Sequence, residues 1–231
     1  MLFLTDFNVV FRCFHFITLF VKRNTFFIFC EKQPELYCFS RRFELYYTVL
    51  RIFIFRKGIL IMLNEKVAEL LNTQINKEFY SAYLYLAFAN YFSDEGLDGF
   101  ANWYNVQAQE ERDHAMLIRQ YMQNNDAPIT FEAIDKPDSE FKSHMEVLEA
   151  GLKHERYVTG LINNIYGAAY DVKDFRTMQF LDWFVKEQGE EETNANDLIK
   201  KMNLFGSDPK SLYLLDQELA ARTYAAPSLV L

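Results

Sequence analysis

Residues 67–92 read VAELLNTQINKEFYSAYLYLAFANYF, and apolar side chains recur through this stretch at intervals of three and four. That spacing places them on one face of an amphipathic α-helix, which is the face that a helix buries. The face is interrupted at its midpoint by the carboxylate of Glu78. A lone buried carboxylate costs several kcal/mol or gives up its charge, so Glu78 needs a compensating partner inside the fold.

Three further stretches with helical spacing carry a polar residue at the middle of the apolar face, namely Glu111, Glu155 and Gln188. The intervals that separate the four residues, counted from Glu78, are 33, 44 and 33 positions. Equal intervals within the first and last pairs bring the polar side chains to the same height in antiparallel hairpins. Four polar side chains at one level of a bundle are most simply explained by a shared cation.

Capping residues and helix breakers divide residues 62–231 into four long helices and one short helix. We expect them over about 64–92, 97–124, 141–170, 171–206 and 209–221, with Asn64 capping the first, Asp171 the fourth and Asp208 the fifth. The short links within each pair require antiparallel hairpins, whereas residues 125–140 are long enough to cross the bundle, so the second and third helices should run parallel. The sequence therefore predicts an all-α fold, a four-helix bundle with one long crossover and a short fifth C-terminal helix.

Glu111 and His114 form a Glu-x-x-His motif, whose spacing puts both side chains on one helix face. In di-iron carboxylate bundles, two helices each contribute one Glu and the other two each contribute Glu-x-x-His. Glu78 and Glu155 match the positions of the single glutamates. The four residues together predict a metal centre in the middle of the bundle.

The fourth helix departs from this pattern, because it offers Gln188 and Glu191 with no histidine. One histidine with otherwise oxygen ligands makes a hard site, which suits Fe²⁺ and suits Fe³⁺ better. Without a second histidine, we expect the second position to hold iron loosely. A loose position fits iron that passes through as a substrate rather than iron that stays as a fixed cofactor.

Three segments carry a resemblance to a known family: NKEFYS at 76–81, AQEERDH at 108–114 and WFVKEQGEEE at 183–192. With their intervals, they make residues 62 to about 224 resemble a bacterial non-haem ferritin. The resemblance implies a ferritin-like bundle that forms a 24-subunit homo-oligomeric shell in the cytoplasm. It also implies a di-iron ferroxidase centre that oxidises Fe²⁺ with O₂ or H₂O₂, and storage of the product as a ferric oxyhydroxide mineral.

The same resemblance implies roles for individual residues. It assigns Glu78, Glu111 and His114 to the first iron, with Glu111 bridging. Glu155 and Gln188 then serve the second iron, with Glu191 as a further candidate. Bacterial members also use a third iron site towards the cavity of the shell, which here corresponds to Glu110, Glu187, Glu190 and Glu191. On the sequence alone, a solvated acidic face explains those four residues equally well.

Tyr85 lies two helical turns beyond Glu78 on the same face, so we expect it to approach the first iron position. The resemblance implies that this tyrosine supplies an electron during oxygen reduction, near Trp183. A core aromatic with a hydrogen-bonded hydroxyl is the alternative. His144 and His154 have no ligand at helical spacing, so we expect both on the surface.

Two features of the wider family are not matched. Haem-binding bacterioferritins place a methionine next to the bridging glutamate, where this chain has Arg112, so we expect no haem. The acidic threefold pore of animal ferritins corresponds to Met178 and Leu181, which leaves the iron entry route open.

Two alternatives belong to other classes of protein. The first is another di-iron protein, either a rubrerythrin-like peroxidase or a mini-ferritin. A rubrerythrin needs Cys-x-x-Cys pairs, which residues 62–231 lack, and a mini-ferritin lacks a fifth C-terminal helix. The second is a structural helical protein whose inward polar residues only hydrogen-bond to one another.

Residues 1–61 differ in composition from the rest of the chain. They hold 13 of the 23 Phe, all three Cys, nine basic and four acidic residues, whereas residues 62–231 hold 15 basic and 28 acidic residues. The resulting charge of −13 on the second part argues against nucleic acid as a partner. The apolar run at 13–21 is too short to span a membrane, so no membrane partner is expected.

This Phe-rich segment shows no helical or alternating period, and its nature stays open. A signal peptide is one interpretation, although no A-x-A cleavage site appears. A regulatory extension, ordered or disordered, is another. The third is translated upstream sequence, with Met62 as the true start. The fold prediction therefore applies to residues 62–231 only.

Overall fold

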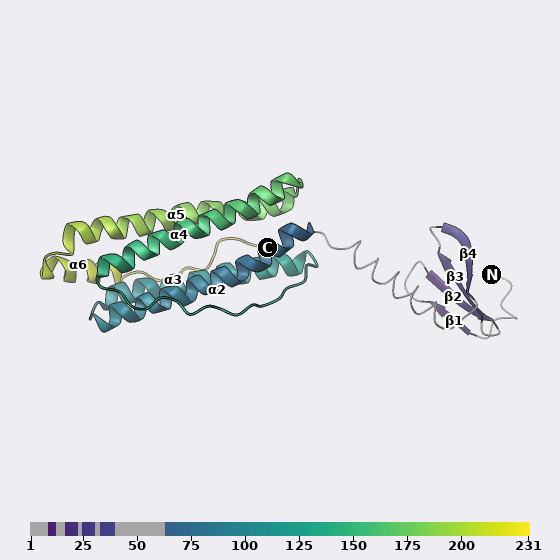
Figure 1. Ribbon diagram of the computed structural model, residues 1–231, viewed down its shortest axis with the longest axis horizontal. Helices are drawn as coiled ribbons and strands as arrows, with labels where there is room; N and C mark the ends of the chain where they lie inside the picture. Colours follow the sequence, from purple (N-terminus) through teal and green to yellow (C-terminus); the bar gives the residue numbers. More distant parts are fainter. Residues whose placement is uncertain (1–8, 13–16, 23–24, 31–32, 40–62) are drawn as a thin grey trace. The chain divides into compact units, whose positions relative to one another are not determined.

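The computed structural model describes residues 9–12, 17–22, 25–30, 33–39 and 63–231. The chain divides into two units, with the boundary between Leu60 and Ile61. Both units are drawn in Figure 1. The interpretation of Met62 as the start of the protein lies outside the described residues.

The described part of the first unit is an antiparallel sheet of four short strands, in the order β1-β2-β3-β4. The strands are β1 (Val9–Arg12), β2 (Ile17–Lys22), β3 (Thr25–Cys30) and β4 (Gln33–Phe39). The sequence did not predict them, and an all-α description holds only for the second unit. The reason is visible in β3, which reads TFFIFC: successive positions are apolar, so the alternation that marks a half-buried strand is missing.

The second unit is helical, as predicted. Its helices are α2 (Glu65–Asp94), α3 (Asp98–Asn124), α4 (His144–Asp171), α5 (Phe175–Phe205) and α6 (Pro209–Leu219). The four long helices lie side by side, and α6 lies at one end of the bundle (Figure 1). None of the helices that the structure describes combines the length and apolar character needed to cross a membrane.

The helix ends follow the expected caps with one exception. Asn64 accepts a hydrogen bond from the Lys66 amide at 3.0 Å, and Asp208 accepts one from the Ser211 amide at 2.8 Å. The prediction that Asp171 caps the fourth helix is wrong, because Asp171 is the last residue of α4 and the cap is Asp174. Lys173 between them has a φ of 58°, a left-handed conformation that ends one helix before the next begins.

The crossover, residues 125–143, runs along the length of the bundle (Figure 1). The Asn72 side chain ties it to α2 through two hydrogen bonds with the Thr130 backbone, at 2.8 and 3.0 Å. Asn76 adds a bond to the Ala133 carbonyl at 3.0 Å. The crossover therefore returns the chain to the opposite end, so α3 and α4 run parallel, as predicted.

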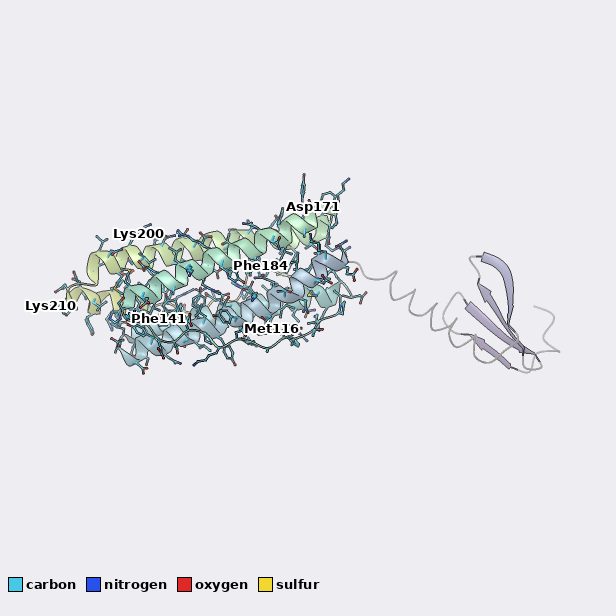
Figure 2. All side chains as sticks on the ribbon, viewed as in Figure 1. Met116, Phe141, Asp171, Phe184, Lys200 and Lys210 are labelled. Carbon is cyan, nitrogen blue, oxygen red and sulfur yellow. The ribbon has the colours of Figure 1, made fainter. Side chains whose placement is uncertain are left out.

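The core has two apolar clusters separated by a polar layer. The first includes Leu71, Ile118, Ile162 and Leu181, and the second includes Phe88, Phe92, Phe100 and Leu148. Phe184, at the inner edge of the first cluster, lies between the helices, whereas Asp171 marks the end of the bundle opposite α6 (Figure 2). We call the buried residues between the clusters the polar layer: Gln74, Glu78, Gln107, Glu111, His114, Glu155, Gln188 and Glu191.

Candidate metal centre

The first half of the candidate centre is formed by α2 and α3. Glu78, Glu111 and His114 are buried, and one ligand atom of each lies within 4.8 Å of those of the others. Gln74, one turn before Glu78, donates to its Oε1 at 2.9 Å. The other oxygen of Glu78 has no hydrogen-bond partner among the described residues. A buried oxygen without a partner is costly, which is the condition that a bound cation would relieve.

The second half adds α4 and α5. Glu111, Glu155 and Glu191 also place one ligand atom each within 4.8 Å of the others. Glu111 is common to both groups, so its carboxylate lies between the two positions. The Gln188 amide lies beside the second group, donating to Glu155 Oε2 at 3.5 Å and to Glu191. The structure therefore brings all four midpoint residues together, as the equal intervals predict.

The protonation states follow from burial. Burial and then the charge of Glu111 raise the pKa of Glu78 and of Glu155 to about 8. Burial and the same charge raise the pKa of Glu191 well above its usual range. Three of the four carboxylic acids therefore keep their protons at neutral pH.

Glu111 behaves differently from its neighbours. Burial alone would raise its pKa, but the hydrogen bond and charge of His114 outweigh burial and lower it. Burial opposes the charge of His114, yet its hydrogen bond to Glu111 raises the His114 pKa to about 9. The metal-free centre thus holds one carboxylate charge against one imidazolium, with His114 Nδ1 at 3.6 Å from Glu111 Oε2.

This donor set fits a pair of hard cations. It offers carboxylate oxygens, one imidazole and one amide, with a single carboxylate between the two positions. The protons on the glutamic acids and on His114 must leave when cations enter, because metal ligands bind in their deprotonated forms. Metal binding at this centre is therefore coupled to proton release.

Tyr85 is buried beside the second half of the centre. Its hydroxyl donates to Glu155 Oε1, and its ring stacks on Tyr104 with a centroid distance of 5.6 Å. The sequence placed Tyr85 near the first position, but the structure gives it a direct bond to a residue of the second. Trp183 lies edge-on to the His114 ring at 5.4 Å, on the α5 side of the first position.

The acidic residues proposed for a third site divide into two groups. Glu110, Glu187 and Glu190 line a cavity of about 270 Å³ next to the centre. Glu191 also borders this cavity, but its side chain is buried and belongs to the second metal-ligand group. We call this space the acidic cavity.

Two residues that the sequence did not single out connect the acidic cavity to the centre. Gln107 donates to Glu111 Oε1 and to Glu191 Oε1, both at 3.0 Å. Its position one turn before Glu111 on the same face was a usable signal. Arg222, beyond the last helix, forms an ion pair with Glu110 at 2.5 Å. No helical period marks Arg222, so the sequence pattern held no signal for it.

The expectation that His144 and His154 lie on the surface holds only in part, because both side chains are half-buried. His154 exchanges a hydrogen bond with Ser81 Oγ at 2.8 Å, and its ring lies 6.0 Å from that of Tyr85. His144 Nδ1 lies 3.2 Å from the Tyr91 hydroxyl. Both sit at the border of a buried helix face, where the partners come from other helices and cannot be read from spacing within one helix.

Comparisons with known proteins agree with this geometry. Residues 68–205 match the Ferritin-like domain family. The Bacterial non-heme ferritin of Staphylococcus saprophyticus is 42% identical over 163 residues, covering 71% of this chain and 98% of that protein. A Probable bacterial non-heme ferritin-like protein of Haemophilus influenzae is 38% identical over 158 residues, or 68% and 96% of the two chains.

Solved structures give the same result. An engineered closed form of the Archaeoglobus fulgidus ferritin is 43% identical, with a TM-score of 0.69 over 71% of this chain and 99% of that one. A humanized archaeal ferritin is 45% identical, with a TM-score of 0.69 and the same coverage.

Proposed function

The chain belongs to the ferritin family, and on that basis we propose that it stores iron by oxidising Fe²⁺ and keeping the product as a ferric oxyhydroxide mineral inside a 24-subunit shell. The observation that carries the proposal is the buried oxygen of Glu78, which has no partner among the described residues at a point where two carboxyl groups and one imidazole converge. Such a group is poorly satisfied by the protein alone, and a cation completes it.

In this proposal Glu111 bridges two iron ions. Glu78 and His114 complete the first position, and Glu155 with Gln188 and Glu191 completes the second. Each Fe²⁺ gives up one electron, and the pair reduces one O₂ to H₂O₂ or one H₂O₂ to two water molecules, with uptake of two protons. Tyr85, whose hydroxyl donates to Glu155, is proposed to replace one Fe²⁺ as an electron donor to the oxidant, losing one electron and its phenolic proton to become a tyrosyl radical.

The second position is proposed to release iron more readily than the first. It has no histidine, and its fourth side chain is the neutral amide of Gln188. The acidic cavity beside it, lined by Glu110, Glu187 and Glu190, is proposed as the next stop of the ion on its way to the mineral. Carboxylate oxygens suit Fe³⁺ better than Fe²⁺, which favours oxidation over return.

The proposal includes a cytoplasmic location, which fits an acidic bundle with no cysteine between residues 62 and 231. A homo-oligomer is the expected assembly, without haem. Of the alternative di-iron proteins, the mini-ferritin is disfavoured by α6, which packs against α3 and α5. The missing Cys-x-x-Cys pairs disfavour the rubrerythrin-like peroxidase.

One experiment separates the candidates. Residues 62–231 are purified, sized by gel filtration and then given Fe²⁺ in air. A particle of about 24 chains that turns amber supports the ferritin proposal. A particle of about 12 chains favours the mini-ferritin. A particle that oxidises Fe²⁺ no faster than buffer alone favours a structural protein. Zn²⁺ given before Fe²⁺ is the control, since it should occupy the centre and stop the oxidation.

A further inference from the structure

The chain after α6 does not end at the tip of the bundle but runs back along α3 (Figure 1). We call residues 220–231 the tail. Its contacts advance along α3, with the Arg222 carbonyl accepting from Asn102 at 3.0 Å and the Tyr224 hydroxyl donating to Asp113 at 2.5 Å. Further on, Ser228 accepts from the Trp183 indole of α5 at 3.0 Å. The tail therefore spans α3 and α5 and forms one wall of the acidic cavity.

Arg222 is the tail residue whose side chain enters this cavity. Its Nη2 lies 2.5 Å from Glu110 Oε2 and donates to Gln107 Oε1 at 2.9 Å. Its Nη1 donates to the Trp103 carbonyl at 3.2 Å, and its Cζ lies 4.1 Å from the centroid of the Trp103 ring. Only 16% of the side chain is exposed. A guanidinium held by three hydrogen bonds and an aromatic face is fixed in one geometry.

Gln107 links Arg222 to the metal centre through hydrogen bonds. Its carbonyl accepts from Arg222, and its amide nitrogen donates to Glu111 and to Glu191 at 3.0 Å each. A flipped amide would turn its oxygen towards two carboxyl groups and its NH₂ towards a guanidinium. Arg222 therefore fixes the orientation in which Gln107 joins the bridging carboxylate to the second-position carboxyl group.

We propose that Arg222 is a positioning residue that acts as a built-in cation in the wall of the acidic cavity. It neutralises Glu110, competes with metal ions for that carboxylate, and holds Gln107 across Glu111 and Glu191. A metal ion reaches the Glu110 carboxylate only when the guanidinium moves away. The consequence for iron movement, slower transfer from the centre to the cavity, rests on the proposed function.

The test is binding of Tb³⁺, a redox-inactive cation that prefers oxygen ligands and whose luminescence is sensitised by a nearby tryptophan. Trp183 lines the acidic cavity and also lies 5.4 Å from the His114 ring, so ions in the cavity and in the metal centre are both sensitised, and the gain is counted against the unmodified protein. We expect Arg222→Gln to bind one more luminescent Tb³⁺ per chain than the unmodified protein, or to bind that ion about tenfold more tightly, since a unit charge at contact distance is removed.

Three variants make the result specific. Arg156→Gln removes the same charge from an exposed arginine 3.9 Å from Glu192 and should titrate like the unmodified protein. Adding Glu110→Gln to Arg222→Gln should cancel the gain, because the competed carboxylate is gone. Arg222→Lys keeps the charge and should stay close to the unmodified protein.

A lowered melting temperature of Arg222→Gln with an unchanged Tb³⁺ titration would make Arg222 a structural tie only and would overturn the proposal. The measurement involves no oxidation. A protein that fails to oxidise Fe²⁺ but gains Tb³⁺ in the variant would refute the proposed function and leave the role of Arg222 standing.

Discussion

The two apolar clusters and the polar layer between them differ in whether their buried groups find all their partners within the bundle. In the second apolar cluster, Phe92 stacks on Phe100 with a centroid distance of 4.8 Å, and both rings are fully buried. In the polar layer, Glu78 is as deeply buried, but one of its oxygens has no partner among the described residues. The apolar clusters are complete as they stand, whereas the polar layer calls for a group from outside the chain.

The comparison separates stability from function along one helix. Replacing buried ionisable groups by well-packed apolar ones is often neutral or stabilising, so the polar layer is not needed to hold the bundle together. Burial of large apolar side chains supplies that stability, at roughly 1.5–3 kcal/mol for each side chain. Substitutions in an apolar cluster should therefore lower stability and leave iron oxidation intact. Substitutions in the polar layer should slow iron oxidation without lowering stability.

The largest effect on chemistry is expected at the residue shared by both metal positions. Glu111→Ala should reduce the initial rate of Fe²⁺ oxidation by more than about 100-fold, since removing even a group that supports a metal ligand costs 10- to 100-fold. The particle should still assemble, because both apolar clusters are intact. Absorbance of the ferric product and gel filtration measure the two outcomes. Oxidation at the unmodified rate would remove Glu111 from the metal centre.

The largest effect on stability is expected in an apolar cluster. Phe88→Ala should lower the free energy of unfolding by about 3–5 kcal/mol, the usual range for deleting a buried phenyl ring. Its folded fraction should oxidise Fe²⁺ normally at low temperature. Denaturant unfolding measures the loss.

The matched variant on the same helix is Glu78→Gln. At neutral pH Glu78 is protonated in the fold but ionised in the unfolded chain, so folding takes up a proton that an amide of the same shape does not need. Glu78→Gln should therefore keep or raise metal-free stability while slowing oxidation. Equal losses of stability in the two variants would erase the distinction between the layers.

The polar layer should also make the metal-free protein sensitive to pH. Glu78 and Glu155 have pKa values of about 8 in the fold, raised by burial from 4.5, and His114 has one of about 9, raised by Glu111 from 6.5. For each group the folded state holds its proton more tightly than the unfolded state. Their contribution to the free energy of unfolding is therefore complete at low pH. It is lost as pH rises, from 4.5 to 8 for the two acids and from 6.5 to 9 for His114.

The melting temperature of the metal-free protein should accordingly fall between pH 6 and pH 9. Saturating Zn²⁺ should reverse the trend, because a bound cation favours the deprotonated ligands. Glu78→Gln is the control, with a shallower decline. A metal-free melting temperature that rises across this range would contradict the assigned protonation states.

More of the apolar packing than of the polar layer could be predicted from the sequence. Helical spacing fixed the four long helices, and the equal intervals fixed the common height of Glu78, Glu111, Glu155 and Gln188. What failed depended on contacts between distant segments. Arg222 reaches Gln107 across 115 positions, and Ser81 lies 73 positions from His154. A periodic pattern within one helix carries no information about such partners.

The strands of the first unit were missed for a different reason. A continuous apolar run such as TFFIFC does not distinguish a strand from a buried helical segment. The cap of α5 was misplaced by one turn because both Asp171 and Asp174 are suitable caps in sequence. The turn through Lys173 decided between them.

The smallest expected effect distinguishes the two metal positions within the polar layer. Gln188→Glu replaces the neutral amide beside Glu155 and Glu191 with a group that gains a charge when a cation enters. The second position should then release iron a fewfold more slowly, so more iron per chain should remain after anaerobic gel filtration. Asn163→Asp adds the same charge at an exposed position of the cavity that Gln188 borders, and it should leave the count unchanged. Equal counts in Gln188→Glu and the unmodified protein would mean that Gln188 only orients Glu155 and Glu191. The looseness of the second position would then come from the missing histidine alone.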